Sequence, residues 1–106
     1  MCGVPGEDRG VSVTITEKDL TAYVRDLAKA FGWRRYHTWL SKHSPAGFPD
    51  EVLLRGPRLV VAELKSSRGY ITDTQAAWLE AWRQIPCAEV YLWTPSEMDE
   101  IARVLR

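Results

Sequence analysis

The sequence is poor in the features that mark secreted or membrane proteins. Its 106 residues include two cysteines, Cys2 and Cys87, too few for a disulfide framework or a cysteine-based metal site. No apolar run approaches the roughly 20 residues of a transmembrane helix. The first residues also lack the basic-then-apolar order of a signal peptide. We therefore expect an intracellular, reducing and cytoplasmic location, with no membrane partner.

Net charge is also missing, because 14 Lys and Arg balance 14 Asp and Glu. Taken alone, this balance argues against a purely electrostatic binder of nucleic acid. The charges are nevertheless unevenly spread. Residues 25–68 hold nine Lys and Arg against four Asp and Glu, a net of +5, and the remainder carries −5. One basic region could therefore steer phosphate toward one face of the protein.

The length and composition predict one small globular domain. A chain of 106 residues that is 45% hydrophobic and 26% charged is typical of a single folded unit. The first ten residues contain Gly3, Pro5, Gly6 and Gly10, a composition typical of a flexible terminus. We expect a flexible leader over 1–15 and a single domain over 16–106.

Hydrophobic periodicity and capping motifs predict an α/β fold. Three helix starts carry capping-box patterns, at 16–19, 72–75 and 94–97. The expected helices are 17–31, 73–85 and a third that follows the box at 94–97. The expected strands are 33–39, 50–54, 59–65 and 88–93. The order α-β-β-β-α-β-α predicts a mixed sheet flanked by helices.

The second and third strands form a predicted hairpin whose register follows from its turn. A symmetric turn between Gly56 and Pro57 pairs residues whose numbers sum to 113, so Asp50 faces Glu63. Opposed residues lie about 4.5–5.5 Å apart and point to one face. Lys65 belongs to the same face because it follows Glu63 by two residues, whereas Leu64 points into the opposite layer.

Two adjacent carboxylates with a neighbouring lysine suit metal-assisted phosphodiester hydrolysis. Mg²⁺ prefers one or two carboxylates together with waters and phosphate oxygens. Such an ion stabilises charge on a phosphate and generates a nucleophilic water. A lysine beside it can orient that water or neutralise phosphoryl oxygens. The alternative is a charged hairpin end with a simple surface Glu–Lys pair.

The residues around these three side chains resemble a known nuclease family. Gly47-Phe48-Pro49-Asp50, Val60-Val61-Ala62-Glu63-Leu64-Lys65 and the downstream Gln75 are similar to the VRR-NUC branch of the PD-(D/E)xK nuclease superfamily. Gly32-Trp33 and Tyr36-His37-Thr38 resemble the lead-in strand of its small stand-alone viral and bacterial members. The resemblance runs from residue 17 to 106. It implies a restriction-endonuclease-like core.

The resemblance also implies a role for each matching residue. Asp50 and Glu63 would bind the metal ion, with the carbonyl of Leu64 completing the site. Lys65 would be the catalytic lysine. Gln75 would flank the site from the following helix.

Three further acidic residues lie close enough in the sequence to be considered as metal ligands. Glu17 would be the acid at the start of the first helix that reaches the metal ion or its water. Asp19 competes for that role, although helix capping already explains it. Glu51 departs from the family pattern, where an apolar residue commonly follows the aspartate. Strand alternation directs it to the other face, so we do not assign it as a ligand.

Candidate contacts to DNA lie around the predicted first strand and in two loops. They are Arg35, His37, Lys42, Ser44 and Arg68. Loops of this composition often grip phosphates, and the alternative for each is a solvated or partly buried structural role.

The resemblance implies a Mg²⁺- or Mn²⁺-dependent DNA endonuclease. Related stand-alone members are similar to Holliday-junction resolvases, so we expect branched DNA as substrate, a homodimer, and a phage or bacterial setting. A dimer would supply the two symmetric active sites that cutting two strands requires. The alternative is a non-catalytic DNA- or protein-binding module on the same fold. A third option is a structural α/β domain with no role in nucleic acid chemistry.

Overall fold

The computed structural model describes residues 14–38 and 45–106. Most of the expected leader therefore lies outside the described residues. The chain forms three α-helices, four strands and one short 3₁₀ helix in the predicted order. Their bounds are α1 Glu17–Ala30, β1 Arg34–His37, β2 Glu51–Arg55, β3 Arg58–Leu64, α2 Asp73–Arg83, β4 Ala88–Trp93, η1 Pro95–Glu97 and α3 Met98–Leu105.

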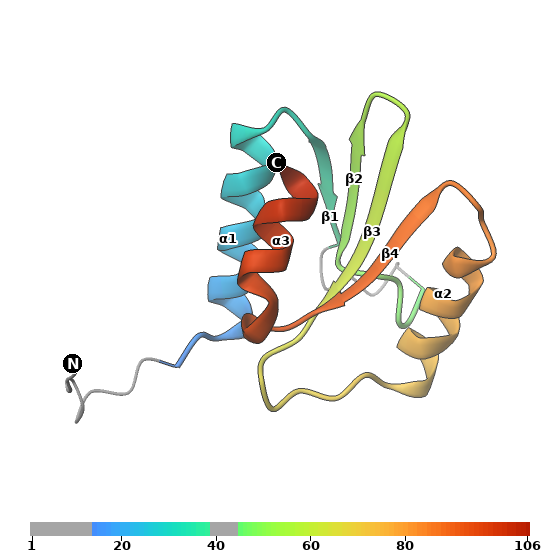
Figure 1. Ribbon diagram of the computed structural model, residues 1–106. Helices are drawn as coiled ribbons and strands as arrows, with labels where there is room; N and C mark the ends of the chain where they lie inside the picture. Colours follow the sequence, from blue (N-terminus) through green and yellow to red (C-terminus); the bar gives the residue numbers. More distant parts are fainter. Residues whose placement is uncertain (1–13, 39–44) are drawn as a thin grey trace.

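The four strands form one mixed sheet in the order β1-β2-β3-β4 (Figure 1). β1 and β2 run antiparallel, as do β2 and β3, whereas β3 and β4 are parallel. The parallel pair needs a crossover, which α2 provides. The mixed α/β sheet flanked by helices is as predicted.

The register of the β2–β3 hairpin is also confirmed. Leu54 pairs with Leu59 and Val52 with Val61. Gly56 has φ of +57° at the first turn position, and Pro57 follows it. This combination is typical of a type II′ turn, which matches the twist of the flanking strands. The two-residue turn therefore fixes which residues of β2 and β3 face each other.

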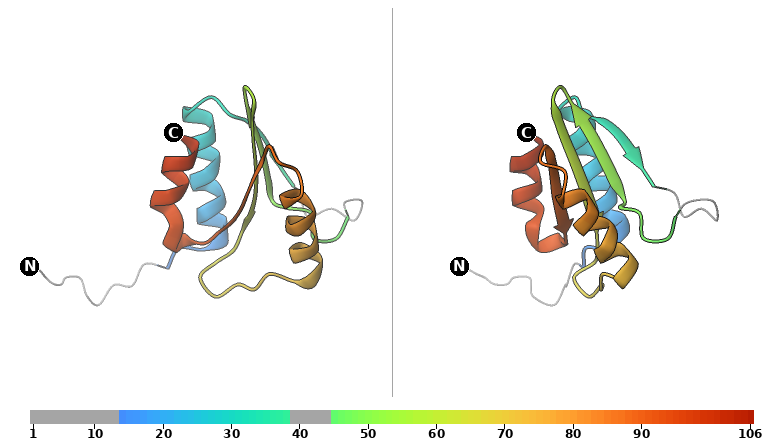
Figure 2. Two further views of the ribbon diagram at one scale, coloured as in Figure 1. Left: turned by 45° about the vertical axis from the view of Figure 1, so that its right-hand side comes forward. Right: turned by 90° about the vertical axis from the view of Figure 1, so that its right-hand side faces the viewer.

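The main core lies between the sheet and the pair α1 and α3 (Figure 2). We call this side of the sheet the core face; it carries Leu53, Val60, Ala62 and Leu64. Trp33 joins the cluster and donates its indole N–H to the Leu105 carbonyl at 2.8 Å. The last carbonyl group of α3, that of Leu105, is thus bound to a side chain just after the C-terminal end of α1.

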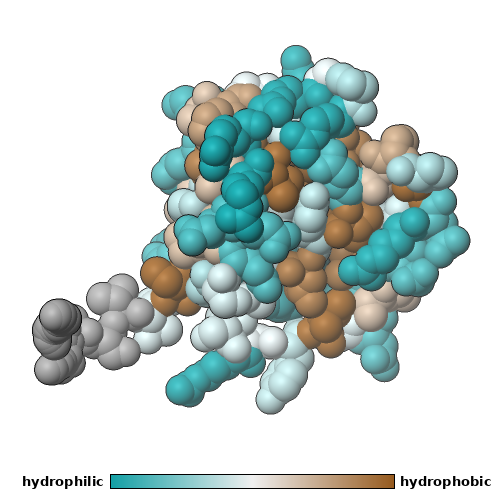
Figure 3. All heavy atoms as spheres, viewed as in Figure 1, coloured by the Kyte–Doolittle hydropathy of each residue, from teal (hydrophilic) through white to brown (hydrophobic). Residues whose placement is uncertain are grey.

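On the opposite side, which we call the site face, α2 packs over β3 and β4, whereas Tyr36 of β1 and Leu54 of β2 are exposed. Leu79 is the one buried residue of that helix. The ring of Phe48 packs edge-on against Trp78 with centroids 5.0 Å apart, so the segment before β2 contacts α2. In the space-filling view, apolar side chains show between the helical layers and are bordered by polar ones (Figure 3).

Several elements are shorter than predicted, and the reasons are local. Trp33 was expected to begin the first strand. Its main-chain N–H instead donates to the Ala28 carbonyl at 2.9 Å, and Gly32 has φ of +77°, which together make a Schellman-type cap of α1. α2 ends at Arg83 because Ile85 donates to Trp82 in a tightened last turn ahead of Pro86.

The third predicted helix start begins as the 3₁₀ helix η1, with Pro95 at its first position. The Glu97 carboxylate accepts from the Thr94 amide at 2.6 Å, as the predicted motif requires. None of the helices in the described part of the chain is both long and apolar enough to span a bilayer.

Gly47 couples the segment before β2 to the start of α2. It has φ of +85°, and a Cβ there would lie 2.6 Å from the Thr74 carbonyl carbon and 2.8 Å from the Gln75 nitrogen. Gly32 has φ of +77° with open space around it.

We expect Gly32→Ala to lower the free energy of unfolding by about 1–2 kcal/mol through backbone strain, and Gly47→Ala to lower it by a further 1–3 kcal/mol or so through overpacking. Urea unfolding of both variants measures the difference, and equal losses would contradict the close approach.

Candidate active site

Asp50 and Glu63 meet at the open end of the hairpin, as the register predicts. Asp50 directly precedes β2, and its Oδ2 accepts the Leu64 amide at 2.8 Å. Glu63 is 1% exposed and lies next to Leu64 near the end of β3. The main chain of β3 therefore holds the Asp50 carboxylate beside that of Glu63.

Two further predicted residues complete the surroundings of Glu63. Its Oε2 accepts from the Gln75 Nε2 at 2.9 Å and lies 3.6 Å from the Lys65 Nζ. Its Oε1 is buried and has no hydrogen-bond partner among the described residues. A buried acceptor without a donor is costly. The structure thus brings Asp50, Glu63, Lys65 and Gln75 together and leaves one carboxylate oxygen available to a ligand.

The ionisation of Glu63 reflects this crowding. Burial, followed by the nearby negative charge of Asp50, raises the pKa of Glu63 to about 8, against the opposing effect of Lys65. Desolvation and a like charge both disfavour the charged carboxylate. A divalent cation between the two groups would reverse this effect and favour ionisation.

Gln75 serves both the fold and the site. Its main-chain N–H donates to the Thr72 hydroxyl at 3.2 Å, and its side-chain oxygen accepts from the Thr72 amide at 2.8 Å. This is the predicted capping box of α2. Because the oxygen is used in the cap, the side-chain NH₂ is directed to Glu63. The cap therefore orients the amide that Glu63 accepts.

The donor set fits a hard divalent cation with few protein ligands. Within residues 14–38 and 45–106, no group of three or more His, Cys, Asp and Glu side chains is arranged to hold a metal ion. Asp50 and the unpartnered oxygen of Glu63 are oxygen donors, and Mg²⁺ retains several waters when it binds one or two carboxylates. The residues present therefore fit Mg²⁺ or Mn²⁺ with a mainly aqueous shell.

Glu17 lies at the start of α1 and is exposed. Its negative charge contributes to the raised pKa of Glu63, as the smallest of the named influences. The structure places it near the pair without joining it to them as a third carboxylate. Asp19 is engaged in capping, because its carboxylate accepts from the Thr16 amide at 3.0 Å. A role for Glu17 toward the metal ion stays a prediction, as does that of the Leu64 carbonyl.

The loop after β3 packs over the stem of Lys65. A Cβ at Gly69 would lie 3.3 Å from the Cβ and the Cδ of Lys65, and the Lys65 side chain is 16% exposed. The loop thus restricts the lysine while leaving its ammonium next to Glu63. Arg68 is exposed in the same loop, where it is accessible to a polyanion.

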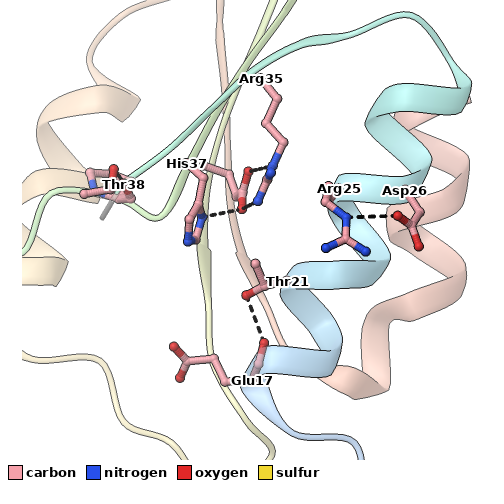
Figure 4. A network of polar contacts seen from close by, with 9 residues as sticks. Glu17, Thr21, Arg25, Asp26, Arg35, His37 and Thr38 are labelled. Atoms are coloured by element: carbon pink, nitrogen blue, oxygen red, sulfur yellow. Dashed lines mark hydrogen bonds and ion pairs between the residues drawn. The ribbon is translucent and has the colours of Figure 1, made fainter. Parts of the chain in front are cut away.

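The other candidate DNA contacts are arranged differently. Arg35 and His37 lie on the core face and reach the same carboxylate, that of Glu51 (Figure 4). His37 is 31% exposed, and Glu51 is fully buried. Lys42 and Ser44 lie outside the described residues. DNA contacts by all four stay predictions, and the side chains of Arg35 and His37 are directed to Glu51.

The sequence pattern alone does not identify the partners of Glu51. It placed Glu51 on the face opposite Asp50, and the structure confirms that placement. Finding Arg35 and His37 beside it requires the β1–β2 register, in which His37 pairs with Glu51. No short turn joins these two strands, so no signal comparable to Gly56-Pro57 was available. The one available hint was a charged residue at an inward-pointing strand position.

Among known proteins, solved structures of similar fold match this chain, whereas sequence comparisons do not. No family model and no curated protein matches the sequence. A solved structure described as a VRR_NUC domain protein is 18% identical with a TM-score of 0.65, over 88% of this chain and 87% of the other. A second, described as a VRR_NUC domain, is 18% identical with a TM-score of 0.66, over 82% and 94%. The fold expected from the sequence resemblance is thus confirmed.

The raised pKa of Glu63 predicts a pH-dependent stability in the absence of metal. The folded pKa of about 8 lies above the ordinary glutamate value of 4.5, so the folded state binds the proton more tightly than the unfolded state. The stability that Glu63 contributes by binding this proton is complete below its unfolded-state pKa. It is lost as pH rises through its folded-state pKa, and the free energy of unfolding then falls by at most about 1.4 kcal/mol per pH unit.

We expect the free energy of unfolding in EDTA to fall between pH 5 and 8, and to fall less in Glu63→Gln. Chemical denaturation across this range measures both slopes. Glu89→Gln is the control, because Arg58 lowers the pKa of Glu89 and its contribution is lost on acidification instead. Parallel curves for the parent and Glu63→Gln would show that Glu63 ionises normally.

Proposed function

Because the chain has the fold of VRR-NUC domains, we propose that it is a metal-dependent DNA endonuclease. The observation that carries the proposal is the convergence of Asp50, Glu63, Lys65 and Gln75 at one end of the hairpin. The buried Glu63 oxygen without a protein partner supports it further. A domain that used the fold only as a scaffold would not need to bury one carboxyl group beside another, where its ionisation is disfavoured.

Asp50 and Glu63 would hold the cation, Mg²⁺ or Mn²⁺. When bound, such an ion supplies charge neutralisation at the scissile phosphate and lowers the pKa of a bound water. Lys65 carries a positive charge 3.6 Å from Glu63, where it can neutralise a phosphoryl oxygen or orient the attacking water. Gln75 keeps the Glu63 carboxylate in one orientation through its Nε2–H group. Preorganised groups of this kind reduce the reorganisation needed in the transition state.

Branched DNA and a homodimer are the finer parts of the proposal. A chain with one such site cuts one strand at a time, and symmetric cutting of two strands needs two sites related by a two-fold axis. Holliday-junction-like substrates present two such strands. The exposed Arg68 in the loop beside Lys65 suits phosphate contact, which is the main source of affinity for DNA.

We expect cleavage of DNA in Mg²⁺ or Mn²⁺ and none in EDTA. The assay compares a four-way junction, a flap and a linear duplex of the same sequence, at low and moderate salt. Preference for the junction supports the branched-DNA proposal, whereas equal rates would limit the function to a non-selective endonuclease. Absence of cleavage on every substrate in both metals would favour a non-catalytic binding module.

Two active-site variants and one control assign the activity to this site. Glu63→Ala removes a metal-binding carboxylate and should reduce the cleavage rate at least about 10³-fold. Lys65→Ala should reduce kcat about 10²–10⁴-fold while Mn²⁺ affinity is largely retained. Glu89→Gln breaks an ion pair away from the site and should cleave at the parental rate. Parental activity in Glu63→Ala would assign any cleavage to another site or a contaminant.

The dimer predicts a sedimentation mass of twice the 12.1 kDa chain. Sedimentation velocity with and without a four-way junction, at protein concentrations from 1 to 100 times that of the assay, measures it. The expected result is a dimer that binds one junction. A 12.1 kDa species at every concentration, including in the presence of DNA, would contradict a dimer.

A further inference from the structure

Glu51 is a buried charge that the proposed chemistry does not use. It is 0% exposed and lies on the core face, where its neighbours on β2 and β3 are aliphatic. Burial of a carboxylate costs several kcal/mol unless the charge is paired and hydrogen-bonded. An apolar side chain would fill this layer without that cost, so the retained charge calls for an explanation.

Three donors from β1 satisfy this carboxylate. Arg35 binds it in bidentate fashion, with Nε 2.6 Å from Oε1 and Nη2 2.8 Å from Oε2. The His37 Nδ1 lies 2.8 Å from Oε2 (Figure 4). Bidentate arginine–carboxylate contacts are strong and directional. They fix Glu51 relative to β1 in a way that apolar packing does not.

The residue after His37 holds the two residues before Glu51. The Thr38 amide donates to the Asp50 carbonyl at 2.9 Å, and the Thr38 hydroxyl donates to the Pro49 carbonyl at 2.7 Å. Three successive residues, 49–51, are thus bound to the end of β1. Their main chain is fixed on the β1 side while the Asp50 side chain is fixed by Leu64 on the β3 side.

We propose that Glu51, held by Arg35 and His37, is a positioning residue that keeps Asp50 in the geometry needed for the divalent cation. Successive strand residues point to opposite faces, so the Glu51 clamp controls the backbone from which Asp50 projects on the site face. Mg²⁺ demands near-ideal ligand geometry, and a misplacement of about 1 Å can cost about 10²-fold in rate. The cation in this inference rests on the proposed function.

A second ion pair of similar geometry provides a control within the same sheet. Arg58 binds Glu89 in bidentate fashion at 2.9 and 2.6 Å. This pair joins β3 to β4 on the core face, near the hairpin turn. Loss of either pair should lower stability, but only loss of the Glu51 pair should disturb Asp50.

The experiment compares Glu51→Gln with Glu89→Gln in two measurements on the full chain. Calorimetric titration with Mn²⁺ measures metal affinity. Amide NMR measures the shift and exchange rate of the Leu64 N–H, which reports directly on the hydrogen bond to Asp50. Thr38→Val and Thr38→Ser form a milder pair, because the serine retains the hydroxyl that binds the Pro49 carbonyl.

We expect Glu51→Gln to weaken Mn²⁺ binding about 10-fold or more, to shift the Leu64 amide and to accelerate its exchange. Glu89→Gln should change the Mn²⁺ affinity and the Leu64 amide exchange rate by no more than about twofold and leave the Leu64 amide shift in place. Thr38→Ser should retain more Mn²⁺ affinity than Thr38→Val. Parental Mn²⁺ affinity together with an unchanged Leu64 amide in Glu51→Gln would overturn the positioning role. If Glu51→Gln does not fold, the same criteria apply to Thr38→Val.

A failure of the proposed function gives a different result. If the parent binds no Mn²⁺ but the Leu64 amide still responds to Glu51→Gln and not to Glu89→Gln, the metal-dependent nuclease is rejected. The positioning of Asp50 by Glu51 is then supported as a property of the fold.

Discussion

The close approach of two carboxyl groups, one of them buried, governs the arrangement at the open end of the hairpin. Glu63 is buried beside Asp50, and neither burial nor a like charge favours its ionised form. The surroundings offset this cost with specific donors. The Leu64 main-chain N–H donates to Asp50. The Gln75 side-chain amide donates to Glu63, and the Lys65 ammonium lies close to the same carboxyl group. Oε1 of Glu63 accepts no hydrogen bond from the described residues, so an additional positive charge would be most stabilising beside this oxygen.

The same residues that make the site also terminate or begin structural elements. Gln75 closes the cap of α2 and donates to Glu63, and Gly47 allows the chain before Asp50 to approach the first turn of that helix. On the other side, Thr38 and Glu51 bind the segment around Asp50 to β1. Helix, hairpin and edge strand therefore each hold one part of the candidate active site, which is consistent with rigid support of its few charged groups.

Much of this arrangement could be predicted from sequence because local signals fixed it. The Gly56-Pro57 turn determined the register, and the register placed Asp50 beside Glu63. The Thr72 box placed Gln75 at a helix start. The pairing of β1 could not be obtained in this way, since β1 ends at His37 and β2 begins at Glu51, too far apart along the chain for a two-residue turn to set the register. The choice between a phosphate contact and a partly buried structural role for Arg35 and His37 stays open at the level of sequence, because a sequence does not reveal which basic residues have a buried acid opposite them.

The shallow anchoring of α2 has a consequence for dynamics. Leu79 is its one buried residue, so little apolar area opposes a local opening of this helix compared with α1 or α3. Such an opening would withdraw Gln75 and admit water to Glu63 without unfolding the core between α1, α3 and the sheet. Binding at Glu63 and the ordering of α2 are thus thermodynamically linked. A ligand that ionises Glu63 would therefore also slow the exchange of amides in α2.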